Sequence, residues 1–64
     1  MAFVAVEGSG VEMIFTKKPY RAMDGMRVWC KDFYSDCVVL PKGSIAKLIG
    51  RELTWEDEPV ELKD

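Results

Sequence analysis

The chain has no histidine, only two cysteines among its 64 residues, and no long hydrophobic run. Without histidine, the usual Ser–His and Cys–His catalytic pairs cannot form within one chain. Two thiolates also fall short of the four Cys or His ligands that a structural zinc site normally needs. We therefore expect no enzymatic activity, no bound metal and no cofactor.

Targeting and membrane signals are also lacking. The N-terminus has neither the basic region nor the apolar core of a signal peptide. No apolar run approaches the roughly 20 residues of a membrane-spanning helix. The sequence thus predicts a cytoplasmic protein without a membrane partner. In the reducing cytoplasm we expect Cys30 and Cys37 to be reduced thiols in the core, with a cross-strand disulfide as the alternative.

Hydrophobic residues make up 48% of the sequence, which favours a folded chain over a disordered one. We expect a single domain over residues 1–64, and a chain this short buries only about 60% of the surface that its unfolded form exposes. The net charge of −2 is unevenly spread, since residues 52–64 carry six acids and one lysine. Residues 56–64 are therefore predicted to form an acidic, solvated C-terminal segment.

Residues 26–40 give the strongest strand signal in the chain. They predict a hairpin whose turn lies at residues 32–35, with one entirely apolar face and a second face that mixes charged and apolar side chains. The register predicts these opposite pairs: Cys30 with Cys37, Lys31 with Asp36, and Trp29 with Val38.

Two glycine-containing turns precede this stretch. Gly8-Ser9 predicts a type II′ turn that joins two strands and places Val6 opposite Val11 and Val4 opposite Met13. The alternative is a partly disordered N-terminus. Asp24-Gly25 predicts a second tight turn. It would place the following pairs opposite one another: Met23 with Met26, and Tyr20 with Trp29.

The C-terminal third begins with a short predicted helix over residues 44–49, with Ser44 as the N-cap and Gly50 as the residue that ends it. Residues 51–55 predict a further strand, and residues 60–63 predict a short edge strand or ordered tail. This order of elements predicts an all-β or β-dominated fold. It would be a strongly bent antiparallel sheet, or a small SH3-like or OB-like barrel, with one short helix.

Two groups of side chains are candidates for binding. Aromatic and basic residues on one face of the predicted central hairpin are of the types enriched at binding hot spots. The turn at Lys42-Gly43-Ser44 would direct backbone N–H groups at an anion, although an ordinary capped turn also explains it. The candidate binding residues are Tyr20, Arg21, Arg27, Trp29, Lys31, Tyr34, Lys42 and Arg51.

These features predict a non-catalytic, homo-oligomeric binding module that binds a protein partner as an accessory or inhibitory factor, of the kind that phages or mobile elements carry. Self-association is expected because apolar residues lie on both faces of the predicted sheet. One alternative is sequestration of a small anionic or nucleotide-like ligand in a pocket between subunits. Another is weak binding of single-stranded nucleic acid, which the acidic segment would oppose.

Overall fold

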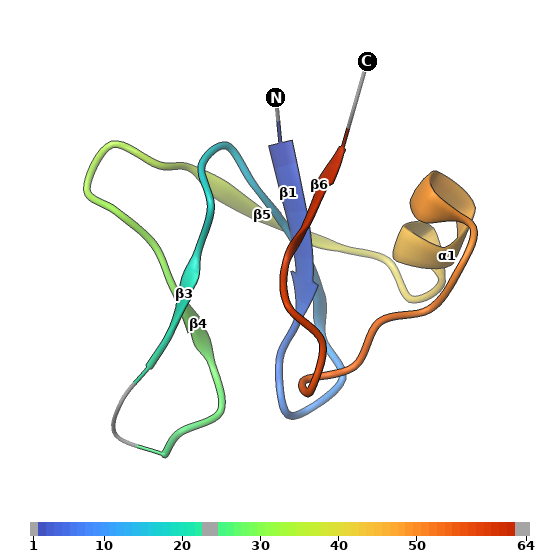
Figure 1. The fold of residues 1–64 in the computed structure, drawn as a ribbon, viewed down its shortest axis with the longest axis horizontal. Helices are drawn as coiled ribbons and strands as arrows, with labels where there is room; N and C mark the ends of the chain where they lie inside the picture. Colours follow the sequence, from blue (N-terminus) through green and yellow to red (C-terminus); the bar gives the residue numbers. More distant parts are fainter. Residues whose placement is uncertain (1, 23–24, 63–64) are drawn as a thin grey trace.

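The computed structural model describes residues 2–22 and 25–62, which form two antiparallel sheets and one short helix (Figure 1). The larger sheet has the order β5-β2-β1-β6. Its strands are β1 (Ala2–Val6), β2 (Glu12–Phe15), β5 (Cys37–Leu40) and β6 (Val60–Leu62). The other elements are β3 (Tyr20–Arg21) and β4 (Trp29–Cys30), which pair as a ribbon, and α1 (Ser44–Ile49). The predicted β-dominated class is confirmed, as an open bent sheet and not a closed barrel.

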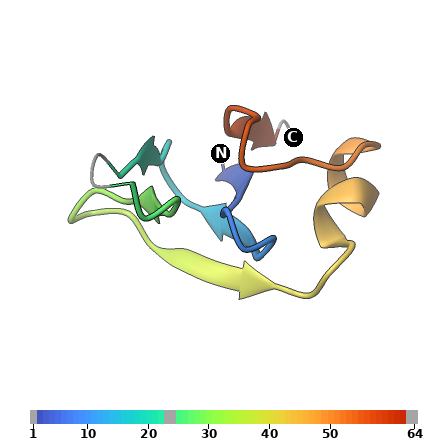
Figure 2. The same ribbon diagram turned by 90° about the horizontal axis from the view of Figure 1, so that it is seen from below.

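Strand β1 lies between β2 and β6 and is buried on both of its faces. Val4, Ala5 and Val6 are all buried, and successive strand residues point to opposite faces. Figures 1 and 2 show α1 and the β3–β4 ribbon on opposite sides of this sheet. The helix side packs Val4, Val6, Ile45 and Leu53 together. The ribbon side packs Ala5, Phe15 and Trp29 together.

The first hairpin is confirmed, but its loop has three residues, Gly8–Gly10, instead of the predicted two. The Glu7 N–H donates to the Val11 carbonyl (3.0 Å), and the Gly10 N–H donates to the Glu7 carbonyl (2.9 Å). Gly10 has a φ of 92°, the left-handed conformation that closes three-residue hairpin loops. The predicted type II′ turn is therefore wrong.

The longer loop shifts the pairing by one residue and changes which side chains share a face. Val4 lies opposite Ile14 instead of Met13, and Val6 is not opposite Val11. Ile14 thus joins the helix-side cluster, whereas Met13 joins the ribbon-side cluster. This register supplies apolar side chains to both faces of the sheet, which at strand β1 are covered by the helix on one side and by the ribbon on the other.

The predicted hairpin over residues 26–40 is wrong. Strand β4 pairs with β3, and strand β5 pairs with β2, so Cys30 and Cys37 lie in different sheets and are free thiols. The predicted pairs of Lys31 with Asp36 and of Trp29 with Val38 are likewise absent from the register of either strand. Beside β2, β5 gains a ladder of four residue pairs.

The ribbon confirms that the segment at Tyr20 pairs with the strand that follows it, with the register again shifted by one residue. Tyr20 lies opposite Cys30, and Arg21 lies opposite Trp29. The predicted pair of Tyr20 with Trp29 is therefore wrong, and the predicted partner Met23 lies outside the described residues. The shift matters because it places the Arg21 side chain beside the Trp29 ring.

Helix α1 has the predicted bounds, and Gly50 ends it with a φ of 81° and an N–H bond to the Ala46 carbonyl (2.9 Å). The predicted N-cap is wrong, because Gly43 holds that position and the Ser44 hydroxyl donates to the Pro41 carbonyl (2.6 Å). The cap comes from β2 instead. The Glu12 carboxylate accepts the N–H groups of Gly43 (2.7 Å) and Ile45 (2.8 Å).

The segment after the helix forms no strand over residues 51–55, contrary to the prediction. Leu53 is buried in the helix-side cluster. A turn then closes where the Asp57 N–H donates to the Thr54 carbonyl (3.0 Å) and the Thr54 N–H donates to the Asp57 carboxylate (2.8 Å). The edge strand predicted over residues 60–63 is confirmed over residues 60–62 as β6, which pairs with β1, and Lys63 lies outside the described residues.

The Glu12 cap predicts a pH-dependent contribution to stability. The N–H donors of Gly43 and Ile45, with the charge of Lys42, lower the pKa of Glu12 from its usual 4.5. The folded chain therefore favours ionised Glu12, so this stability is present above the usual pKa and is lost as the pH falls through the lowered value. Glu12→Gln should cost about 1 kcal/mol or less at neutral pH, because the carboxylate is partly exposed.

Urea unfolding of both chains between about pH 2 and 7 measures this contribution. We expect the stability difference between the wild type and Glu12→Gln to shrink once the pH falls below the usual pKa of 4.5. A difference that stays constant across the whole range would contradict the cap.

Candidate functional site

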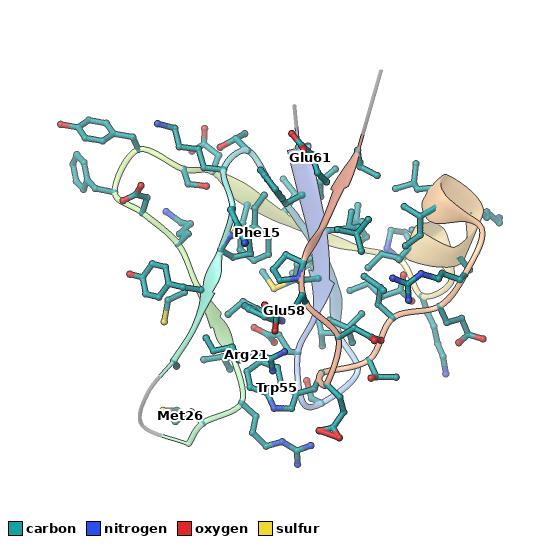
Figure 3. All side chains as sticks on the ribbon, viewed as in Figure 1. Phe15, Arg21, Met26, Trp55, Glu58 and Glu61 are labelled. Atoms are coloured by element: carbon teal, nitrogen blue, oxygen red, sulfur yellow. The ribbon has the colours of Figure 1, made fainter. Side chains whose placement is uncertain are left out.

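Arg21 joins the β3–β4 ribbon to the C-terminal loop. Its guanidinium lies 4.6 Å from the ring centroid of Trp29 and 4.7 Å from that of Trp55, within the range of cation–π attraction. The two indole rings are 5.2 Å apart. The guanidinium also donates to the carbonyls of Trp55 (2.6 Å), Glu56 (3.3 Å) and Asp57 (3.2 Å) and to the Glu58 carboxylate (3.1 Å). Figure 3 shows the side chains of Arg21, Trp55 and Glu58 close together. The first residues of the acidic segment, 56–58, are thus attached to the β3–β4 ribbon.

Trp29, the centre of the binding patch predicted from the sequence, belongs to the core. It is only 7% exposed and packs with Ala5 and Phe15. Its indole N–H donates to the Val6 carbonyl (2.9 Å), which satisfies its polar atom inside the protein. Arg21 and Trp29 are therefore a structural unit and do not offer a flat surface to a partner.

The other basic candidates are dispersed over the structure. Arg27 has a left-handed φ of 59°, and its carbonyl accepts the N–H of Gly8 (2.8 Å), so its backbone connects the loop of the first hairpin to the segment before β4. Lys42 and Arg51 are exposed at the two ends of the helix. The sequence analysis placed Arg27 in the patch with the aromatic candidates, and it placed Lys42 and Arg51 in a second group near the helix.

The anion contact predicted at the helix start already has an occupant from the chain itself. The N–H groups of Gly43 and Ile45 donate to Glu12, and the N–H of Ser44 donates to the Pro41 carbonyl (3.1 Å). An added anion would meet the Glu12 carboxylate at close range. The backbone donors that the hypothesis of an anion beside Lys42 requires are therefore already used within the chain.

The loop between β4 and β5, residues 31–36, presents two aromatic side chains to solvent, and we call it the aromatic loop. Phe33 is 87% exposed and Tyr34 is 77% exposed. Their rings form an edge-to-face pair with centroids 5.1 Å apart. The Lys17 ammonium lies 5.9 Å from the Tyr34 ring centroid. Figure 1 shows this loop extending away from both sheets.

A buried serine holds the aromatic loop in place. Ser35 is almost fully buried, and its hydroxyl lies 3.3 Å from the Thr16 hydroxyl and accepts the Lys17 N–H at 3.3 Å. Its N–H donates to the Asp32 carbonyl (3.1 Å), and its carbonyl accepts the Lys31 ammonium (2.9 Å). The loop is therefore fixed before any partner arrives.

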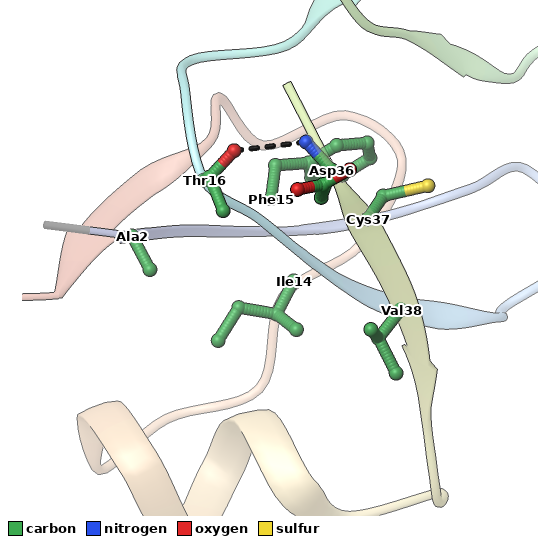
Figure 4. A pocket seen from close by; sticks show the side chains of 7 residues that line it. All are labelled: Ala2, Ile14, Phe15, Thr16, Asp36, Cys37 and Val38. Atoms are coloured by element: carbon green, nitrogen blue, oxygen red, sulfur yellow. Dashed lines mark hydrogen bonds between the residues drawn. The ribbon is translucent and has the colours of Figure 1, made fainter. Parts of the chain in front are cut away.

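A second set of bonds fixes the end of the loop to strand β2. The Asp36 N–H donates to the Thr16 hydroxyl (2.9 Å), and the Thr16 N–H donates to the Asp36 carbonyl (3.0 Å) (Figure 4). The loop ends at this point and strand β5 begins.

The aromatic loop can make apolar and cation–π contacts. Nowhere in residues 2–22 and 25–62 do three Cys, Asp or Glu side chains gather closely enough to hold a metal ion. The sequence prediction included Tyr34 and Lys31 but missed Phe33 and Lys17. Two adjacent aromatic residues at a predicted turn are a usable signal, because both cannot point into the same core.

Comparison of the chain with protein-family models, with curated proteins and with solved structures found no match. Within the described part of the chain, no helix is long and apolar enough to cross a membrane.

The Arg21 cluster predicts that a conservative substitution destabilises the fold. Arg21→Lys keeps the charge but loses the planar fork that reaches several carbonyls at once. We expect a loss of roughly 2 kcal/mol in unfolding free energy, typical of hydrogen bonds made by charged groups and moderated by partial exposure. Urea unfolding followed by tryptophan fluorescence would measure it. Arg51→Lys is the matched control, because Arg51 is exposed, and equal stability of the two variants would contradict the prediction.

Proposed function

We propose that this protein is a non-catalytic binding module that contacts a partner protein through the aromatic loop. The supporting observation is the pair of exposed rings, Phe33 and Tyr34, on a loop fixed by the buried Ser35. Aromatic side chains supply much of the binding energy at protein interfaces. A loop that is already ordered loses little conformational entropy when it binds.

The chemistry of the loop indicates what kind of partner it fits. Phe33 and Tyr34 require an apolar cleft that can take up two rings at right angles. Lys17, beside the Tyr34 ring, favours a carboxylate at the rim of that cleft. A small domain that fills a cleft in this way would act as an accessory or inhibitory factor. The free thiols of Cys30 and Cys37 fit a reducing compartment such as the cytoplasm.

Binding of single-stranded nucleic acid is the second candidate, because bases also stack on exposed rings beside cations. The position of Lys17 next to Tyr34 favours it. Asp32 and Asp36 belong to the same loop, however, and the chain has a net charge of −2, so phosphates would be repelled. We therefore place a protein partner first. The self-association expected from the sequence is a separate proposal that rests on strand β5.

The proposed site predicts a variant that loses binding but keeps its fold. Replacing both rings, Phe33→Ser with Tyr34→Ser, should change the unfolding free energy by about 0.5 kcal/mol or less, because exposed side chains contribute little to the core. The same change should weaken partner binding by more than about tenfold. The control is Leu48→Ser, which removes an exposed apolar side chain from the helix on the far side of the sheet.

Finding the partner requires a probe placed in the loop itself. A photoreactive residue, Phe33→p-benzoylphenylalanine, should cross-link to one defined protein in the producing cells, and the same residue in place of Leu48 should not. The affinity for that protein is then measured with the purified variants. Equal cross-linking at both positions would contradict a site in the loop. Binding of a labelled single-stranded oligonucleotide at low salt, lost in the double variant, would replace the protein partner by a nucleic acid.

A further inference from the structure

Strand β5 is an edge of the larger sheet, and its outward backbone groups have no partner among the residues that the structure describes. The Thr16 N–H donates to the Asp36 carbonyl (3.0 Å), so Thr16 and Asp36 form a hydrogen-bonded pair at the end of the ladder between β2 and β5. Bonding directions alternate along an antiparallel strand. Val38 and Leu40 therefore direct their N–H and C=O groups toward β2, and Cys37 and Val39 direct theirs outward.

Strand β5 is short, but it lacks the charges and prolines that normally prevent edge strands from pairing. Residues 37–40 contain no charge and no proline, and Val38 and Val39 are 60% and 61% exposed. The opposite edge, β6, differs. By the same alternation it presents Pro59, which has no N–H group, and the charged Glu61 (Figure 3). Of the two edges of the larger sheet, as far as the structure describes them, β5 is the one that offers a regular row of donors and acceptors.

We infer that two copies of this chain pair edge to edge through β5, antiparallel, about a two-fold axis at Val38. The axis stands perpendicular to the sheet and keeps every residue on its own face. Opposite residues in an antiparallel pair share a face. The two-fold axis must therefore lie between the two copies of the same residue, so that this residue is opposite itself. Cys37 of one copy then exchanges both hydrogen bonds with Val39 of the other, and Val39 does the same with Cys37.

The neighbouring registers satisfy fewer groups. An axis at Val39 would place Cys37 opposite Pro41, which has no N–H to donate. An axis at Cys37 would place Val39 opposite Ser35, whose N–H already donates to the Asp32 carbonyl. Only the axis at Val38 pairs all four outward groups of each copy's edge. Because the β5 edge is complementary to itself in this register, a second copy of the chain is the partner that fits it.

The side chains fit the same arrangement. Val38 meets Val38 of the second copy on the helix side, next to an apolar hollow of about 160 Å³ that Ile14 and Phe15 help to line (Figure 4). On the ribbon side, Cys37 meets Val39 of the second copy. Asp36 falls opposite Leu40, so no like charges face each other. Both exposed valines thus bury part of their surface.

The two-fold pairing closes the assembly at a dimer, because it uses β5 of both copies and leaves only the β6 edges outside. A four-residue edge is small beside the roughly 1,200 Å² of a stable interface, so we expect dissociation in the range of tens of micromolar. Dimerisation requires no partner for the aromatic loop. Measuring dimerisation on the purified chain therefore tests this inference alone, and its result leaves the proposed function of the aromatic loop open.

Amide hydrogen exchange of the wild-type chain tests the pairing directly. Raising the concentration from about 5 µM to about 1 mM should slow exchange at Cys37 and Val39 by about tenfold or more, because only those amides gain partners. Val38 and Leu40 already bond to β2 and should change little. A chain that stays monomeric by sedimentation at the higher concentration overturns the inference and leaves this edge to a strand of a different protein.

Two substitutions at one position separate the edge hydrogen bonds from the side chain. Val39→Pro removes only an outward N–H, which an edge strand tolerates. It should weaken dimerisation by about tenfold or more, because each copy loses one donor. Val39→Thr keeps the N–H and the branched shape and should dimerise like the wild type. Equal dimerisation of the two folded variants would overturn the inference.

The register has its own test in a chain with Cys30→Ser and Cys37→Ser. Val38→Cys should form a disulfide-linked dimer on mild oxidation, because its Cα atoms would lie about 4.5 Å apart across a non-hydrogen-bonded pair. Val39→Cys should link more slowly, because its two copies would be diagonal neighbours about 7–8 Å apart. Faster linking at position 39 would overturn the register. If the serine background does not fold, the wild-type exchange measurement still decides on the pairing.

Discussion

The guanidinium of Arg21, held between the rings of Trp29 and Trp55, connects parts of the chain that have few other contacts. Through Trp29 it is linked to β1, since the indole N–H donates to the Val6 carbonyl. Through the carbonyls of residues 55–57 it fixes the loop that leads into β6. A domain this small has little core to spare. One side chain here performs the linking that a disulfide or metal provides in many small proteins.

Sequence patterns predicted the elements better than their pairing. The helix over residues 44–49 and the edge strand over residues 60–62 are marked by local signals, such as Gly50 at the helix end. Pairing depends on competition between distant segments, which no local signal reports. Residues 37–40 suit a hairpin with β4 in composition, but beside β2 they gain four residue pairs. In the first hairpin, one additional loop residue moved every side chain of β2 to the face opposite the predicted one.

The candidate site shows the same division between residue type and placement. Trp29 and Phe33 are both aromatic and only four positions apart, yet one is buried and the other is 87% exposed. Composition could suggest that aromatic residues bind something, but only packing shows which of them are accessible. Glu12 is a similar case, because its cap acts on Gly43, 31 positions away. No helix-capping pattern in the sequence could have found an acceptor supplied by a different strand.

The aromatic loop and the β5 edge meet at one pair of residues, Thr16 and Asp36. The bond from the Asp36 N–H to the Thr16 hydroxyl closes the loop, and the bond from the Thr16 N–H to the Asp36 carbonyl sets which β5 groups face outward. A two-fold axis at Val38 would therefore carry two aromatic loops on one continuous sheet, in a fixed relation. Two linked sites can raise apparent affinity by orders of magnitude for a partner that offers two clefts. Weak dimerisation would then be a means of regulation, because the second contact exists only where the chain is concentrated.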